Sequence, residues 1–232
     1  DAIRKPDCIV TTNTSGIPIA EIAAGRSESF QQHFLGTHFF NPPRYLKLLE
    51  VIPSPTTSPA VLKFVADFGE TVLGKGVVIC KDRPNFIGNR IGTYAGILGL
   101  KYTLENGYSF NEVDDFTGPI IGHPKSASYR LLDLVGVDIM YHVANNLYPA
   151  IPDDESREDV KPPALLKDMV DRGWLGNKSK IGFYKEAKVG SKREYHVLDP
   201  KTMEHKPTVK SSHESIVNAE IYDPLGEKLR YI

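Results

Sequence analysis

The sequence predicts an α/β segment followed by an all-α segment. Two observations support this order. Short apolar runs alternate with helical patterns up to about residue 80, whereas residues 86–173 contain helical patterns and no strand signal. Beyond residue 185 the sequence becomes more polar. We therefore expect three parts, residues 1–81, 82–185 and 186–232, with the main boundary near residues 81–85.

The first part is predicted to be an alternation of strands and helices. Its first strand ends at the polar turn Asn13–Gly16, and its second helix begins at Ser58 and Pro59, an N-cap followed by proline. The predicted strands cover residues 8–12, 34–40, 46–52 and 77–80, and the predicted helices cover residues 17–25 and 59–73.

The second part is predicted to be helical throughout. Ser109 and Glu112 have the spacing of a capping box, which marks the start of one helix. Apolar residues three and four apart predict the others, at residues 86–105, 127–148 and 162–173. The polar stretch after Tyr184 is typical of a linker or a hairpin, and the end of the sequence resembles the truncated start of a further segment.

Composition narrows the class of function. The hydrophobic fraction of 41% is that of an ordinary globular protein. The net charge is -1, so no overall charge favours binding to nucleic acid or to an acidic membrane. Cys8 and Cys80 lack the spacing of a disulfide framework or a zinc site. The sequence shows neither a signal peptide nor a membrane-spanning run. We therefore expect a soluble cytoplasmic protein that acts on a small molecule, without nucleic acid, membrane or metal.

Polar residues follow or lie within the predicted strands: Ser15, His38 and Glu50. In an open α/β sheet, ligands bind at the carboxyl ends of strands, so these side chains are predicted to converge there. A histidine between aromatic residues could equally be a packing residue, and residue type leaves both interpretations open. The sequence contains no glycine-rich dinucleotide or phosphate motif. The one glycine-dense segment, Gly74-Lys75-Gly76, follows a predicted helix and precedes a strand, whereas a phosphate loop follows a strand and precedes a helix.

Four segments, NTSGIPIAEIA, GTHFFNPP, LLEVI and KDRPNFIGNR, resemble the 3-hydroxyacyl-CoA dehydrogenase family in their order and spacing. Looser similarity in PIIGHPKSASYRLLDLVGVD and GWLGNKSKIGFY extends the resemblance over about residues 5–185. It implies the C-terminal part of a Rossmann-like NAD-binding domain, without its glycine-rich half, followed by the helical C-terminal domain of the family. The family more often has a small residue where Asn85 stands.

The resemblance also implies site residues. A catalytic pair falls on His38 and Glu50, and this suits the chemistry because imidazole exchanges protons near neutral pH and a carboxylate can fix its tautomer. Hydrogen-bonding side chains are expected around this pair to hold the substrate and the cofactor. The implied binding residues are Ser15 and Asn89 for the substrate, and Asn13, Ser15 and Asn41 for NAD.

The function predicted from these residues is NAD-dependent oxidation of 3-hydroxyacyl-CoA to 3-ketoacyl-CoA in fatty-acid β-oxidation, with this chain inactive by itself. Two alternatives stay open: a short-chain 3-hydroxybutyryl-CoA dehydrogenase, which the long C-terminal extension disfavours, and a non-catalytic dimerisation module, which intact His38 and Glu50 disfavour. A metal hydrolase is a third alternative, which the absence of an H-E-x-x-H motif from the sequence disfavours. Besides acyl-CoA, the expected partner is a second copy or an intramolecular domain, bound through residues 86–150 of the helical region.

Overall fold

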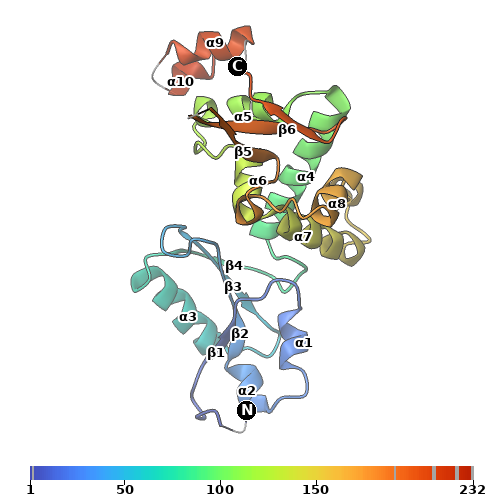
Figure 1. The fold of residues 1–232 in the computed structure, drawn as a ribbon. Coiled ribbons are helices and arrows are strands. Elements are labelled where there is room, and N and C mark those ends of the chain that lie inside the picture. Colours follow the sequence, from blue (N-terminus) through green and yellow to red (C-terminus); the bar gives the residue numbers. More distant parts are fainter. Residues whose placement is uncertain (2, 191, 211–212, 223–224, 231–232) are drawn as a thin grey trace. The chain divides into compact units, whose positions relative to one another are not determined.

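The chain divides into two compact units. The computed structural model describes residues 1, 3–190, 192–210, 213–222 and 225–230. The first unit reaches Gly92 and the second starts at Thr93. Each unit contains its own β-sheet (Figure 1). Among the described residues, no helix is long and apolar enough to cross a membrane.

The first unit is built on a four-stranded sheet in the order β1-β2-β3-β4. The β1-β2 and β3-β4 pairs are parallel, whereas β2 and β3 are antiparallel, so the sheet is mixed. All four predicted strands and both predicted helices are confirmed, and the additional helix α2 was too short to give a periodic pattern. The elements are β1 (Val10–Thr12), α1 (Ile19–Ala23), α2 (Glu28–Gln32), β2 (Phe34–Phe39), β3 (Leu48–Pro53), α3 (Pro59–Thr71) and β4 (Gly76–Ile79).

The two faces of this sheet carry separate hydrophobic clusters, because side chains alternate along each strand. Leu35 and Val51 belong to the cluster that includes α3, whereas Phe34 and Ile52 belong to the cluster that includes α1. The two helices lie on opposite sides of the sheet (Figure 1). Since His38 follows Phe34 by four residues on the same strand, it lies on the α1 face.

The predicted helix starts are partly right. Ser58 occupies the N-cap of α3 but its side chain makes no capping hydrogen bond, so Pro59 alone marks this start. Ser109 and Glu112 form the complete capping box that their spacing predicted. The helical pattern at residues 127–148 is divided into two helices at Gly136, whose φ of 113° lies outside the helical region.

The second unit combines helices with a three-stranded antiparallel sheet. Of the two alternatives for the polar stretch after Tyr184, linker or hairpin, the structure contains the hairpin. Val197 and Leu198 of that hairpin are buried in the same core as the helices. The elements are α4 (Gly88–Asn106), which begins in the first unit, then α5 (Phe110–Thr117), α6 (Tyr129–Val135), α7 (Val137–Ala150), α8 (Ala164–Asp171), β5 (Tyr184–Val189), β6 (Lys192–Asp199), β7 (Glu204–Pro207), α9 (Glu214–Glu220) and α10 (Leu225–Lys228), with 3-10 turns η1 (Pro119–Ile121), η2 (Arg157–Val160) and η3 (Asn177–Ser179).

Two buried carboxylates organise this second core. Asp133 accepts hydrogen bonds from the backbone amides of Phe183 and Tyr184, both at 2.8 Å. Asp114 accepts from the amide of Tyr129 at 2.6 Å and from the Tyr184 hydroxyl at 2.7 Å. Burial raises the pKa of Asp133 to about 6. Both carboxylates bond to groups of their own unit, so their role here is to hold the start of β5 against the helices.

Candidate active site

His38 and Glu50 form a buried imidazole–carboxylate pair on neighbouring strands. They are directly opposite each other in the antiparallel β2-β3 register, so both side chains lie on the same face. His38 Nδ1 lies 2.7 Å from Glu50 Oε2, and the two side chains are only 8% and 1% exposed. The sequence interpretation placed Glu50 within a strand and expected it to converge with His38 near the carboxyl ends of the strands. Cross-strand pairing in the middle of β3 brings the two side chains together.

The second oxygen of Glu50 binds the start of α4. Oε1 accepts hydrogen bonds from the backbone amides of Ile87 at 3.0 Å and Gly88 at 2.7 Å. Amides at a helix N-terminus have no partner within the helix and carry partial positive charge, which stabilises a carboxylate. Burial raises the pKa of Glu50, but the hydrogen bonds from His38, Gly88 and Ile87 together outweigh burial and hold that pKa below its usual value. Glu50 is therefore negatively charged at neutral pH.

Cys80 lies beside the same carboxylate. Burial, followed by the charge of Glu50 and a hydrogen bond to it, raises the pKa of the Cys80 thiol to about 11. The thiol is therefore protonated at neutral pH and is a poor nucleophile. Cys8 and Cys80 are both free cysteines.

Two aromatic rings flank the imidazole. The ring centroid of His38 lies 4.6 Å from that of Phe40 and 5.6 Å from that of Phe86, with interplanar angles of 65° and 66°. Both contacts are edge-to-face, a favourable geometry for aromatic pairs. His38 thus packs against aromatic residues and also pairs with a carboxylate. Its second nitrogen, Nε2, is the one that Glu50 does not hold.

The remaining predicted site residues lie around this pair in different ways. Asn89 Nδ2 donates to Ser15 Oγ at 3.0 Å, which joins the loop after β1 to the first turn of α4. Asn13 Oδ1 accepts from the backbone amide of Phe39 at 2.9 Å, which joins the same loop to the end of β2. Asn41 is exposed two residues beyond β2, and the described hydrogen bonds connect it to none of the others. Their roles toward a ligand stay predictions.

The sequence analysis missed the carboxylates that cap helices in this unit. Asp82 accepts from the amides of Ile19 at 2.9 Å and Ala20 at 2.8 Å, so it caps α1 as Glu50 caps α4. The sequence did contain a signal for these caps. Pro18 precedes α1 and Ile87 precedes α4, and neither side chain can accept a hydrogen bond from the first amides of a helix, so those amides need an acceptor from elsewhere in the chain. Since carboxylates already occupy both N-termini, neither can cradle a pyrophosphate. The residues implied for NAD, Asn13, Ser15 and Asn41, carry hydrogen-bonding side chains, and neither of these two helix N-termini adds a phosphate site to them.

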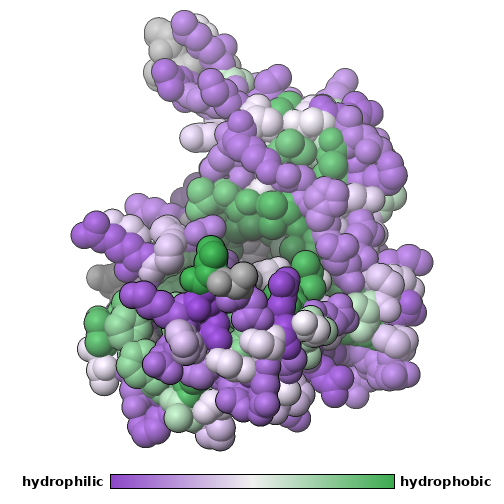
Figure 2. Space-filling model, turned by 90° about the horizontal axis from the view of Figure 1, so that it is seen from below, coloured by the Kyte–Doolittle hydropathy of each residue, from purple (hydrophilic) through white to green (hydrophobic). Residues whose placement is uncertain are grey.

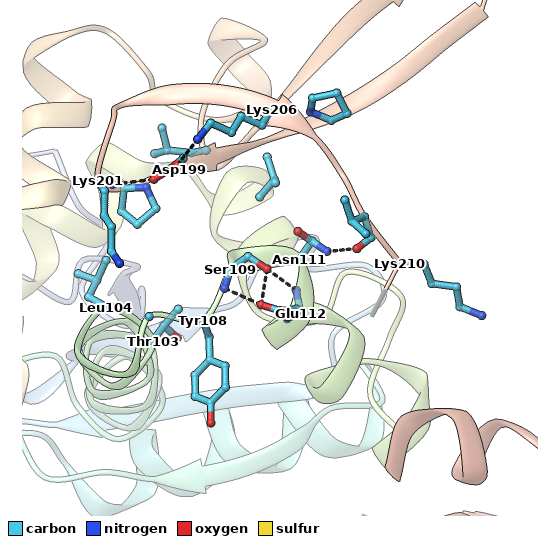
Figure 3. A pocket seen from close by; sticks show the side chains of 16 residues that line it. Thr103, Leu104, Tyr108, Ser109, Asn111, Glu112, Asp199, Lys201, Lys206 and Lys210 are labelled. Carbon is cyan, nitrogen blue, oxygen red and sulfur yellow. Dashed lines mark hydrogen bonds and ion pairs between the residues drawn. The ribbon is translucent and has the colours of Figure 1, made fainter. Parts of the chain in front are cut away.

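A separate cavity of about 500 Å³ lies in the second unit, between the α4-α5 junction and the β6-β7 strands (Figure 3). Several of its polar groups bond to one another: Glu112 joins Ser109 at the start of α5, Asp199 joins Lys206, and Asn111 joins the Val209 backbone. This cavity holds no imidazole–carboxylate pair. The pair in the first unit is therefore the candidate active site. No cluster of metal-ligating side chains occurs among the residues that the structure describes.

The fold is a mixed α/β unit with a buried imidazole–carboxylate pair, followed along the chain by a unit of helices and a three-stranded sheet. A pair of this kind is suited to general acid–base chemistry. Residues 1–83 match the family description "3-hydroxyacyl-CoA dehydrogenase, NAD binding domain", and residues 86–186 match "3-hydroxyacyl-CoA dehydrogenase, C-terminal domain". The chain belongs to the 3-hydroxyacyl-CoA dehydrogenase family.

Individual relatives agree with this assignment. The chain is 52% identical over 203 residues to a probable 3-hydroxyacyl-CoA dehydrogenase of Bacillus subtilis, an alignment that covers 88% of this chain and 25% of that protein. The crystal structure of Mycobacterium tuberculosis FadB2 is similar with a TM-score of 0.71 and 34% identity, covering 80% of this chain and 62% of that one. The (S)-3-hydroxybutyryl-CoA dehydrogenase of Ralstonia eutropha has a TM-score of 0.68 and 31% identity, covering 78% and 61%. The chain thus spans only part of each of these relatives.

Proposed function

We propose that this chain carries the proton-transfer site of an NAD-dependent 3-hydroxyacyl-CoA dehydrogenase that serves fatty-acid β-oxidation. The observation that carries the proposal is the buried hydrogen bond of 2.7 Å between His38 Nδ1 and Glu50 Oε2. The names of the similar proteins supply the substrate class, an acyl-CoA with a hydroxyl on its third carbon. We expect the chain alone to be inactive, because the sequence contains no glycine-rich dinucleotide loop.

Oxidation of a secondary alcohol removes a proton from oxygen and a hydride from carbon. NAD+, when bound, supplies the hydride acceptor. Nδ1 of His38 donates to Glu50, so Nε2 carries the lone pair and takes the hydroxyl proton. The carboxylate of Glu50, held ionised by the Ile87 and Gly88 amides, stabilises the imidazolium that results. In the reverse direction the same Nε2 proton returns to the 3-oxygen.

Ser15 and Asn89 are proposed to hold the substrate oxygen. The amide nitrogen of Asn89 is a donor, so the Ser15 hydroxyl is the acceptor in their hydrogen bond of 3.0 Å. The hydroxyl hydrogen of Ser15 is then available to donate to the substrate. Asn13 and Asn41 are proposed to lie near the nicotinamide and its ribose, and the hydrogen bond from Phe39 leaves the Asn13 amide nitrogen for such a contact.

The test is NADH formation by the gene product that carries this chain, with 3-hydroxybutyryl-CoA and 3-hydroxyhexadecanoyl-CoA as substrates. We expect His38→Gln to lower kcat by about 10²–10⁴-fold, the usual contribution of a general base. His33→Gln is the matched control, because His33 lies in the same unit and bonds the Ser29 backbone instead. Turnover of the short substrate alone would favour the short-chain alternative. A wild-type protein inert on both would favour the interaction module.

The helical region is proposed to bind a second copy or another domain of its own protein. Hydrophobic side chains are exposed on the surface (green in Figure 2). On α6 and α7, Leu131, Leu134, Val135 and Ile139 are 42%, 63%, 50% and 46% exposed. Exposed apolar groups of this kind mark association surfaces. Size-exclusion chromatography with light scattering tests self-association, and a monomer at all concentrations would leave only the intramolecular partner.

A further inference from the structure

We propose that Asn85 is a positioning residue for the candidate active site. Its left-handed backbone sets the turn that directs the Ile87 and Gly88 amides to Glu50 and the Phe86 ring to the imidazole. The inference rests on the proposed function of the His38–Glu50 pair and assigns to the turn before α4 a part in holding that pair.

The first observation is a concentration of backbone strain. Asn85 has a φ of 59° and Phe86 a φ of 49°, two consecutive residues in the left-handed region. The region is uncommon for residues other than glycine, and for a bulky residue such as phenylalanine it is a marked outlier. Asparagine tolerates it better than most. Elsewhere among the described residues, positive φ without glycine occurs at three separate positions, Ala127, Lys180 and Met203.

Such strain persists only where the surroundings enforce it. Asn85 and Phe86 are 5% and 4% exposed. The Asn85 amide donates to the Ser15 backbone oxygen at 3.3 Å, which ties the turn to the loop after β1. The Phe86 ring belongs to the hydrophobic cluster on the α1 face of the sheet. The turn is therefore fixed from both sides.

The consequence of this turn lies in the next two residues. The amides of Ile87 and Gly88 converge on one oxygen, Glu50 Oε1, at 3.0 and 2.7 Å. Convergence of consecutive amides on one acceptor depends on the direction in which the chain enters α4. The same turn places the Phe86 ring edge-to-face with His38 at 5.6 Å. A relaxed backbone at position 85 would therefore loosen both the carboxylate and the imidazole.

Two substitutions separate the backbone from the side chain of Asn85. Alanine disfavours the left-handed conformation, whereas glycine adopts it freely. For the gene product that carries this chain, we expect Asn85→Ala to lower kcat about tenfold, with KM changed less than about twofold, since loosened geometry affects the reaction more than binding. The acid limb of its pH–kcat profile should also move. Asn85→Gly should keep kcat within about twofold of wild type.

A second readout does not depend on turnover. Diethyl pyrocarbonate modifies accessible, unprotonated imidazole, and peptide mass spectrometry gives the rate at each histidine. We expect His38 to react slowly in the wild type and in Asn85→Gly, and at least about threefold faster in Asn85→Ala because local opening becomes easier. Lys180→Ala is the matched control, since Lys180 has a φ of 62° in the second unit. It should lower the melting temperature without changing His38 labelling or the pH profile.

Each outcome decides the proposal. It stands if Asn85→Ala changes the pH profile and His38 labelling while Asn85→Gly restores both. It is overturned if the two variants are equally impaired, because the side chain would then carry the effect, or if Asn85→Ala matches wild type in both readouts. If the wild type proves inert on 3-hydroxyacyl-CoA while His38 labelling follows the expected order, the proposed function fails and the positioning role survives.

Discussion

Replacing Glu50 by glutamine tests the centre of the proposed mechanism. The carboxylate accepts hydrogen bonds on both of its oxygens, from His38 Nδ1 at Oε2 and from the Ile87 and Gly88 amides at Oε1. Glutamine offers one acceptor oxygen and one donor NH2 group in the same volume. It therefore cannot satisfy both sides. Its oxygen has to face either the helix or the imidazole.

The size of the effect follows from which side glutamine satisfies. If its oxygen faces the helix amides, its NH2 faces Nδ1 of His38, which places the imidazole proton on Nε2. That tautomer cannot accept the substrate proton, and a wrong tautomer costs roughly 10³–10⁴-fold in kcat, or about 4–5 kcal/mol of transition-state stabilisation. If its oxygen faces His38 instead, the NH2 opposes two amide donors, and folding stability should fall by about 2–4 kcal/mol, because hydrogen bonds to a charged acceptor are lost.

The assay measures both quantities on one variant. Steady-state NADH formation gives kcat, and urea unfolding followed by circular dichroism gives the free energy of unfolding. Glu70→Gln is the control, because Glu70 is an exposed residue of α3 and undergoes the same chemical change. A Glu50→Gln enzyme with kcat within about threefold of wild type and unchanged stability would refute the reasoning on both counts.

Three further outcomes are expected. Because the pKa of Glu50 is held below its usual value of 4.5, its carboxylate stabilises the fold above that pH, and the stability difference between wild type and Glu50→Gln should shrink as pH falls from 7 to 3; a constant difference in melting temperature would contradict this. Ser15→Ala and Asn89→Ala should each lower kcat/KM about 10-fold, and the double variant should lose less than the product of the two, whereas independent effects would show that their hydrogen bond does not couple them. Ellman's reagent at pH 8 should label exposed Cys8 promptly and leave Cys80 unmodified until urea unfolds the protein; early labelling of both would contradict the burial of Cys80.

Much of the fold could be predicted because local patterns determine it. The apolar runs around β1 to β4 and the capping box at Ser109 are features of neighbouring residues, and each corresponds to an element in the structure. The pairing order of the strands was not available in this way. The sequence interpretation gave no strand directions; β2 and β3 are antiparallel, and that register places His38 opposite Glu50.

The site was predicted through resemblance more than through residue chemistry. Composition and spacing left His38 open as a packing residue, and the structure shows both aromatic packing and a carboxylate partner. Glu50 caps α4 across a sequence separation of 38 positions, and Asp82 caps α1 across a separation of 62 to 63 positions. No local pattern encodes such distant pairs. What the sequence did contain was the lack of a capping side chain before each helix.

Helix α4 begins with the amides that bind Glu50 and continues into the hydrophobic core of the second unit, where Ile97 and Leu100 are fully buried. The first turn of α4 thus contacts the candidate active site, and its later residues belong to the core of the second unit. Recombination that exchanged one unit for that of a relative would have to cut within or just before this helix. We expect such chimeras to be functional only when Glu50, the first turn of α4 and the core residues around the rest of α4 come from compatible parents. The two units should therefore be exchanged together and not singly.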